Sequence, residues 1–359
     1  MICKIKKGGN EKLNLLKKLC ETPGISGYEE RIQRVIKEEL EKVTDEVKVD
    51  KLGNIIGIKK ANQFLGDSPP KKVMLAAHMD EIGFMISFVD KDGFLRFAPV
   101  GGFDPKTLIA QRVIVHGEKD IGGVIGSKPI HILEEEERKK PPKIKDLFID
   151  VGLKKDEVSK IVKAGDFVTL DRNFKELNDK IITAKAFDDR VGVYVMIEAL
   201  KRIKDCYVDI YAVATVQEEV GLRGATVSSF SVEPDVGIAL DVTIASDLPG
   251  TKEEEMVTTL GGGTAIALMD SHTISNKKIV NFLRKIAEEN KIKYQTDILL
   301  GGGTDAGAIQ RSKSGVPACT VSIPTRYIHS VVEMCHKEDI ENSIRLMSKF
   351  LENIHKGDF

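Results

Sequence analysis

The sequence predicts an α/β protein, built around a buried mixed sheet and interrupted by a small inserted β domain. Two short apolar runs, residues 73–77 and 208–216, are bounded by polar residues, which is typical of strands buried on both faces of a sheet. Helical periodicity surrounds both runs. Residues 83–174 instead alternate short strand-like runs with glycine-rich turns. We therefore predict a discontinuous α/β domain from residues 1–82 and 175–359, with a β-barrel or sandwich formed by residues 83–174.

The remaining elements follow from periodicity and turn signals. A turn cluster at 22–27 separates two helices, and Leu52-Gly53 lies at the tip of a hairpin. The charge run 134–142 is typical of a solvated loop. In chain order we predict helix 13–20, helix 29–43, hairpin 47–58, strand 181–186, helix 191–203, strand 236–240, helix 279–290, strand 318–323 and helix 338–354.

Composition excludes several classes of partner. The 359 residues carry a formal net charge of -1, so no global field favours nucleic acid or an anionic membrane. No apolar stretch approaches the ~20 residues of a membrane span, and residues 1–10 lack the apolar core of a secretory signal. Five cysteines are scattered without a Cys-x-x-Cys pair, which favours reduced thiols. We expect a cytoplasmic protein without nucleic-acid or membrane partners.

Six polar side chains share one property, because each lies at or just beyond the carboxyl end of a predicted strand. Parallel strands bring these ends to one crevice. Nitrogen and carboxylate ligands without thiolates suit zinc, cobalt or manganese, and six groups suffice for two metals if one carboxylate bridges them. One carboxylate would then remain free for proton transfer. The six are His78, Asp188, Glu218, Glu219, Asp241 and His329.

Each residue also has a simpler interpretation. Asp188 or Asp189 can cap the helix that begins near Arg190, and His329 can be a core histidine that donates to a backbone carbonyl. Asp241 can cap a turn. Glu218 and Glu219 can belong to a solvated strand-to-helix turn, although neighbours in an extended segment point to opposite faces and should have different partners.

Two further features bear on the crevice. Asp80 lies two residues after His78, so it faces the same way and can accept a hydrogen bond from the second ring nitrogen. The glycine triplets 261–263 and 301–303 lack the Walker lysine and the dinucleotide spacing, so we expect them to line a cleft without binding a nucleotide.

These motifs resemble those of the tetrahedral di-metal aminopeptidases, a family of glutamyl, leucyl and deblocking enzymes in which some members carry a cellulase or endoglucanase name. The resemblance runs essentially end to end. The matching stretches are 77–83, 186–190, 217–225, 240–243, 301–306 and 326–330.

The resemblance implies a role for each residue of the crevice. His78, Asp188 and Asp241 would hold one divalent metal, zinc or cobalt, and Asp188, Glu219 and His329 a second. Glu218 would be the general base, Asp80 would orient His78, and a cis peptide bond would join Asp188 to Asp189. Substrates would be short peptides that lose their N-terminal residue. Residues 261–266 look most like those of leucine-preferring members.

The resemblance also implies a di-zinc exopeptidase sandwich in which residues 83–174 form a PDZ-like dimerisation domain. Six dimers would form a hollow tetrahedral dodecamer. We expect exposed apolar surface on this domain at Phe84, Phe88, Phe97 and Phe103, because large exposed patches usually mark interfaces.

Two other functions are weighed against this one. A glycoside hydrolase needs two carboxyls roughly 5–9 Å apart across the scissile bond, whereas adjacent Glu218 and Glu219 should point apart. The chain also lacks Trp as a platform for sugar rings. A non-catalytic, metal-stabilised peptide-binding scaffold should have lost the base at Glu218 while keeping the ligands, and here Glu218 is present.

Overall fold

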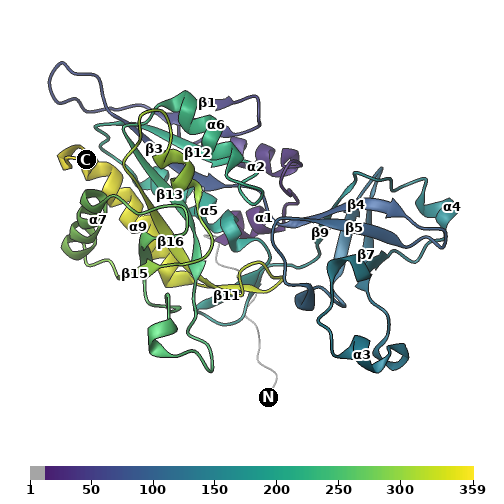
Figure 1. Cartoon of the computed structure of the whole chain (residues 1–359). Helices are drawn as coiled ribbons and strands as arrows, with labels where there is room; N and C mark the ends of the chain where they lie inside the picture. Colours follow the sequence, from purple (N-terminus) through teal and green to yellow (C-terminus); the bar gives the residue numbers. More distant parts are fainter. Residues whose placement is uncertain (1–12) are drawn as a thin grey trace.

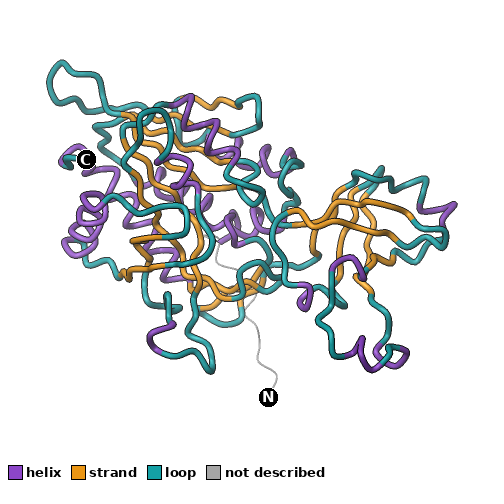
Figure 2. Tube along the Cα trace, in the orientation of Figure 1, coloured by secondary structure: helices purple, strands orange, loops and turns teal. Residues whose placement is uncertain are grey.

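The computed structural model describes residues 13–359, which form a layered α/β sandwich with a barrel beside it (Figure 1). Figure 2 shows the strands of the two parts as separate groups, the larger group lying among helices. The predicted α/β class with a mixed sheet is confirmed. Residues 1–12, which include Cys3, lie outside the described part of the chain.

The centre of the sheet is parallel. Its strands run β12 (Asp209–Thr215), β3 (Lys72–His78), β13 (Val236–Ile244) and β16 (Ala318–Arg326), each parallel to the next. Nearly every side chain on these strands is buried, which explains why their sequences read as continuous apolar runs. Their carboxyl ends therefore meet at one edge of the sandwich.

The sheet has eleven strands within residues 13–359, and its outer pairings are antiparallel except for the parallel pair β14 and β15. The strands β14 and β15, which pair beside β16, are absent from our prediction because the run at 264–269 follows a glycine triplet and carries no turn signal of its own. The outer strands are β1 (Glu46–Val49), β2 (Ile55–Lys59), β10 (Lys175–Glu176), β11 (Ile181–Ala184), β14 (Thr264–Met269), β15 (Tyr294–Ile298) and β17 (Glu333–His336).

Helices cover both faces of the sheet. The larger core lies between the sheet and a layer made of α1 (Asn14–Glu21), α2 (Glu30–Leu40), α5 (Phe187–Arg202), α7 (Lys277–Glu289) and α9 (Lys337–Asn353). A smaller core lies on the other face, under α6 (Arg223–Val232) and α8 (Asp305–Gln310). None of the described helices is long and apolar enough to cross a membrane.

The segment between β3 and β10 forms a closed six-stranded barrel in the described chain, with a core of its own. The one-turn helices α3 (Glu135–Arg138) and α4 (Lys155–Val158) lie in its loops, α3 within the predicted charge-rich loop. Around the barrel the strands are β4 (Gly83–Val89), β5 (Leu95–Val100), β8 (Phe148–Asp150), β7 (Asp120–Gly126), β6 (Arg112–His116) and β9 (Phe167–Leu170).

The expected exposure of four phenylalanines is mostly wrong. Phe84 and Phe97 are buried in the barrel core, and Phe103 is half-buried and stacks on Phe84 at 4.5 Å between ring centroids. Only Phe88 of the four is largely exposed, at 59%. Strand alternation would place Phe84, Ile86 and Phe88 on one face, but the register shifts between Ile86 and Phe88 and turns Phe88 outward.

Candidate active site

Polar side chains from four strands and one helix converge at the carboxyl edge of the sheet. His78 is the last residue of β3, Glu218 and Glu219 follow β12, and His329 follows β16. Asp188 lies in the first turn of α5. Asp241 is placed differently from our expectation, because β13 continues past it to Ile244 by pairing with β16.

Within residues 13–359, two groups of side chains have the composition and spacing of metal sites. One contains His78, Asp188 and Asp241, and the other contains Asp188, Glu219 and His329, with ligand atoms within 4.8 Å of one another in each group. Asp188 belongs to both. Its Oδ1 lies 2.9 Å from His78 Nε2 and its Oδ2 lies 3.3 Å from His329 Nε2. These are the groups that the family resemblance implied.

The electrostatics of the two groups fit cations. Glu219 Oε2 lies 3.3 Å from His329 Nε2, but Glu219 Oε1 is buried and has no hydrogen-bond partner among the described residues. Burial alone would lower the pKa of His329, yet the carboxylates of Asp188 and Glu219 outweigh it and raise the pKa to about 11. A site this negative, with oxygen and imidazole donors only, suits two divalent cations of the zinc or cobalt type.

The first turn of α5 separates the roles of two adjacent aspartates. The peptide bond between Asp188 and Asp189 is cis, as predicted. Asp189 Oδ1 accepts a hydrogen bond from Gly192 N at 3.0 Å, which is the helix cap that the sequence left open. Asp189 Oδ2 accepts from His78 N at 3.2 Å. Asp189 thus caps the helix, and Asp188 remains free to face the histidines.

The turn that carries the two glutamates is held by side chains from the N-terminal third of the chain. Asn54 Oδ1 accepts from Val216 N, and a Glu29 carboxylate oxygen accepts from Gln217 N. The turn itself uses a positive φ of 123° at Gly221, which favours glycine. A side chain at Gly224 would collide with Asn54 and with the backbone of Val216, just after β12. Sequence reasoning gave Asn54 and Glu29 no such role.

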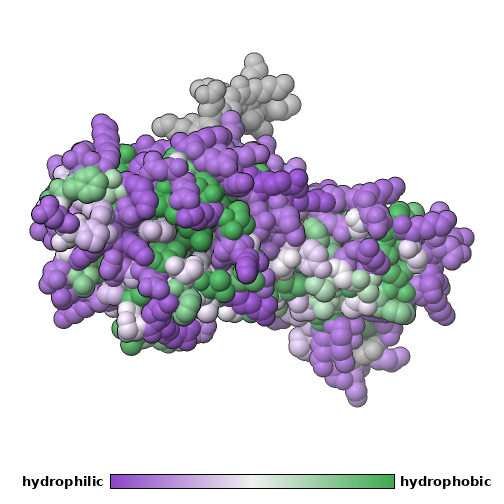
Figure 3. All heavy atoms as spheres, turned by 90° about the horizontal axis from the view of Figure 1, so that it is seen from above, coloured by the Kyte–Doolittle hydropathy of each residue, from purple (hydrophilic) through white to green (hydrophobic). Residues whose placement is uncertain are grey.

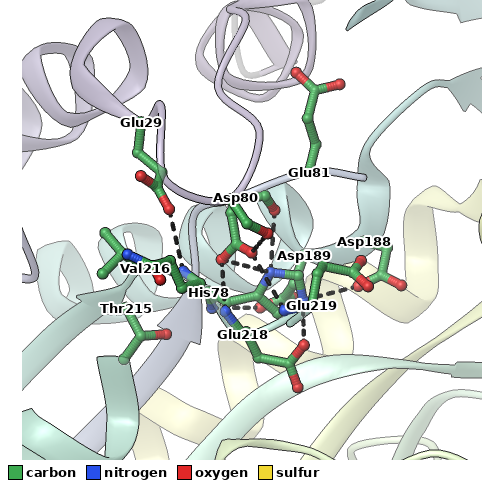
Figure 4. Close-up of polar contacts among 12 residues, drawn as sticks. Glu29, His78, Asp80, Glu81, Asp188, Asp189, Thr215, Val216, Glu218 and Glu219 are labelled. Atoms are coloured by element: carbon green, nitrogen blue, oxygen red, sulfur yellow. Dashed lines mark hydrogen bonds and ion pairs between the residues drawn. The ribbon is translucent and has the colours of Figure 1, made fainter. Parts of the chain in front are cut away.

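Asp80 acts on this turn more than on His78. Its Oδ1 accepts from Glu218 N at 3.0 Å and its Oδ2 from Glu219 N at 3.2 Å, while Ser26 Oγ also donates to Oδ2 (Figure 4). His78 Nδ1 lies 3.6 Å from Asp80 Oδ1 and 3.1 Å from the Asp80 backbone oxygen, so the ring is nearer the carbonyl than the carboxylate. Asp80 therefore orients His78 through its carbonyl, and both glutamates through its carboxylate.

Glu218 and Glu219 point to different partners, as expected for neighbours in an extended segment. Glu219 contacts His329, whereas Glu218 Oε2 lies 3.9 Å from His78 Nε2 and belongs to neither metal-binding group. Burial raises the pKa of Glu218 well above its ordinary range, and the charges of Asp241 and other carboxylates add to this despite His78. A carboxyl with a raised pKa beside the metal-binding groups is suited to proton transfer.

Glu333, on β17, is a residue that sequence reasoning missed. It is 2% exposed, and its two carboxylate oxygens accept from Asp188 N and from His329 N, each at 3.0 Å. One side chain thus holds the backbones of two members of the second group. Only its position four residues after His329, in a short strand, could have indicated this role from the sequence.

We expect Glu333→Gln to weaken cation binding at the second group by about 10–100-fold, because the amide nitrogen cannot accept from either backbone N–H. Zinc affinity, measured by competition with a chromophoric chelator, checks this. Asp339→Asn is the matched control, since Asp339 is also buried and accepts from two backbone N–H groups, those of Gly261 and Gly263. Equal zinc affinities in the two variants would contradict the positioning role.

A cavity of about 680 Å³ opens beside the metal-binding groups. Its wall includes the second glycine triplet, Gly301 to Gly303, as expected for a triplet that lines a cleft. The first triplet does not line it and instead donates two N–H groups to Asp339 of α9. His272 also lines the cavity.

Comparison with known proteins agrees with this geometry. The family model of the M42 glutamyl aminopeptidases matches residues 53–346. The lysyl aminopeptidase of Pyrococcus furiosus is 41% identical over 96% of this chain and 98% of its own length. An aminopeptidase structure from Desulfurococcus kamchatkensis has a TM-score of 0.91 and 44% identity, covering 95% of this chain and 94% of that one.

A second similar structure is the TET1 peptidase of Pyrococcus horikoshii, described as assembling into a tetrahedron or a large octahedral shell. Its TM-score is 0.83 at 36% identity, covering 95% of this chain and 99% of that one. Because the family model spans most of the chain and these relatives align along nearly its whole length, the chain belongs to the M42 glutamyl aminopeptidase family of peptide hydrolases.

Proposed function

We propose that this aminopeptidase uses two divalent cations, zinc or cobalt, to remove N-terminal residues from short peptides. The observation that carries the proposal is the pair of side-chain groups that share Asp188. His78 and Asp241 complete the first group, and Glu219 and His329 the second. Glu218 lies beside both groups and joins neither.

Two bound cations would supply Lewis acidity, polarising the scissile carbonyl and lowering the pKa of a water molecule toward ~7. Glu218 takes the proton from the attacking water and returns it to the leaving amine, so it acts first as general base and then as general acid. Asp80 holds the backbone N–H groups of both glutamates and so fixes the direction from which Glu218 approaches. Glu219 and His329 would hold the cation near which the free α-amine of the substrate lies.

The two rival functions fit the geometry less well. A glycosidase would place two carboxyls across one bond, but Glu218 and Glu219 contact different histidines, and the chain has no Trp for a sugar platform. A non-catalytic scaffold gives no reason for a carboxyl with a raised pKa that stands outside both metal-binding groups.

The proposal is tested with a panel of aminoacyl amides, assayed with zinc and with cobalt. We expect release of the N-terminal residue from free aminoacyl amides and no cleavage of the matched N-acetylated amides, because the α-amine is part of what the site binds. Equal cleavage of the free and acetylated compounds would contradict an aminopeptidase.

We also propose that residues 83–174 form a separate, PDZ-like dimerisation domain beside a catalytic domain made of residues 1–82 and 175–359. The barrel has its own apolar core, and Phe88 and Val124 are exposed on it. Figure 3 shows hydrophobic surface on the barrel among mainly hydrophilic side chains. The assembly described for the Pyrococcus horikoshii peptidase supports six such dimers in a dodecamer.

Light scattering at micromolar concentration should therefore report a particle of twelve 39.6 kDa chains. Phe88→Glu places a charge on the proposed dimer surface and should shift the protein to smaller species. Phe64→Glu alters a phenylalanine equally exposed on a sandwich loop, and the barrel-mediated dimer should survive it. A monomeric wild-type protein would refute the assembly.

A cytoplasmic location is part of the same proposal. All four cysteines of the described chain are buried and free, which supports a reducing compartment.

A further inference from the structure

The cavity beside the metal-binding groups carries acidic side chains that the proposed reaction does not use. Asp270 and Thr243 line it, together with the end of β13 and the loop that contains the second glycine triplet. Behind them Asp297 is buried near both. We propose that this cavity receives the side chain of the substrate's N-terminal residue and selects lysine or arginine through Asp270, Asp297 and Thr243. This inference rests on the proposed aminopeptidase function.

The distance along β13 suits a long basic side chain. Asp241 and Thr243 are two residues apart on one strand, so both side chains lie on the same face about 6.6 Å apart along it. A substrate whose backbone lies at the metal-binding groups therefore meets Thr243 and the acidic residues two residues further along β13. The four-carbon stem of lysine is suited to this span.

Asp270 is 9% exposed and is held in place by its own turn. Its Oδ1 accepts from His272 N at 2.7 Å and from Thr273 N at 2.6 Å. Both hydrogen bonds use Oδ1, which leaves Oδ2 available to a ligand in the cavity. The Asp270 carboxylate is therefore oriented before a ligand binds, which reduces the entropy cost of binding a cationic group.

Close to Asp270, Thr243 and Asp297 carry buried polar atoms that lack the partners a ligand would supply. Thr243 is 2% exposed and Asp297 is 3% exposed, and neither Thr243 Oγ1 nor Asp297 Oδ1 has a well-aligned hydrogen bond among the described residues. Burial raises the pKa of Asp297 to about 6. The nearby Thr243 hydroxyl lowers this pKa, and the negative charge of Asp270 raises it further. Buried polar atoms without partners are rare, and each calls for an explanation.

The charge of the cavity is not balanced from within the protein. The ion pairs among the described residues include neither Asp270 nor Asp297. An ammonium or guanidinium group would supply both the missing charge and the missing donors. The cavity wall also includes the apolar side chains of Leu222, Ile244 and Leu299, and the methylene stem of a basic side chain packs well on such a surface.

Residues 261–266, which look most like those of leucine-preferring members, do not contradict this inference. Their triplet binds Asp339 of α9, and no residue of the stretch lines the cavity. A resemblance in that stretch therefore does not describe the surface that a substrate side chain would contact.

The test compares kcat/KM for lysyl and leucyl amides in the zinc-loaded, full-length protein. We expect the wild type to favour the lysyl amide. Asp270→Asn and Asp297→Asn keep the shape of each side chain and remove its charge, so the ratio of lysyl to leucyl kcat/KM should fall by about 10-fold or more in at least one of them.

Asp90→Asn is the matched control, because Asp90 Oδ1 also accepts two backbone N–H groups in a turn, in this case between two barrel strands. Its ratio should equal that of the wild type. A wild type that prefers the leucyl amide, or a ratio unchanged in both cavity variants, would overturn the inference. Loss of activity on both amides in the wild-type protein would instead count against the proposed function, so the two failures are distinguishable.

Discussion

Glu218→Gln is expected to lower turnover on a leucyl amide by ~10²–10⁴-fold while the metal content stays at two per chain. Glutamine keeps the shape of the side chain but cannot take a proton from water, and general acid–base catalysis typically contributes a factor of this size. Glu218 belongs to neither metal-binding group, so neither group should lose a ligand. The melting temperature should hold or rise, because burial already disfavours the charged form of this carboxyl.

Glu219→Gln is the matched comparison, since the two residues are neighbours on the same turn. Glu219 is a member of the second group with His329, so its variant should lose metal, thermal stability and activity together. Metal stoichiometry by plasma emission and turnover on one substrate separate the two variants. Loss of a metal in Glu218→Gln, or turnover near that of the wild type, would show that the roles are wrongly assigned.

Removal of divalent cations with a chelator is expected to abolish peptide hydrolysis, and zinc or cobalt should restore it. Without cations the site lacks the Lewis acid that the proposed reaction uses to polarise the carbonyl and to activate water. Turnover is measured before chelation, after dialysis and after stepwise return of metal. Magnesium at the same concentration is the control, because it prefers oxygen ligands in octahedral sites.

The same experiment separates the peptidase from a glycoside hydrolase. Acid and base carboxyls of a glycosidase work without a metal, so hydrolysis of a glucan that persisted in the chelator would contradict our proposal. Recovery with cobalt but not zinc would identify the cation without changing the roles of the residues.

Much of this site can be predicted from the sequence because the ends of buried strands can be recognised in it. His78, Glu218 and Glu219 follow apolar runs that can hardly be anything but buried strands, and parallel strands bring their ends together. Asp241 was located equally well, although its strand proved longer than its apolar run. Pairing with β16 extends β13 past Asp241 through three β-branched residues, 242–244, because the charged residue that ends the apolar run does not end the strand.

The parts that escaped prediction depend on contacts distant in sequence. Glu333 and Asn54 act on backbone groups more than 140 residues away, and periodicity carries no information about such pairs. Phe84 and Phe97 looked like surface because the closure of the barrel is decided by the pairing of six strands. The bulge that turns Phe88 outward likewise depends on the register between two strands, which the local sequence does not fix.

The spread of the metal-binding residues along the chain has a consequence for biosynthesis. They run from His78 to His329, and the turn that carries the glutamates is tied to Asn54 and Glu29. Contacts this distant form late in folding, since long loops must close first. A chain emerging from the ribosome therefore lacks the second cation site until β16 and the residues after it have been made. Peptide cleavage by the proposed two-cation site therefore requires a nearly finished chain.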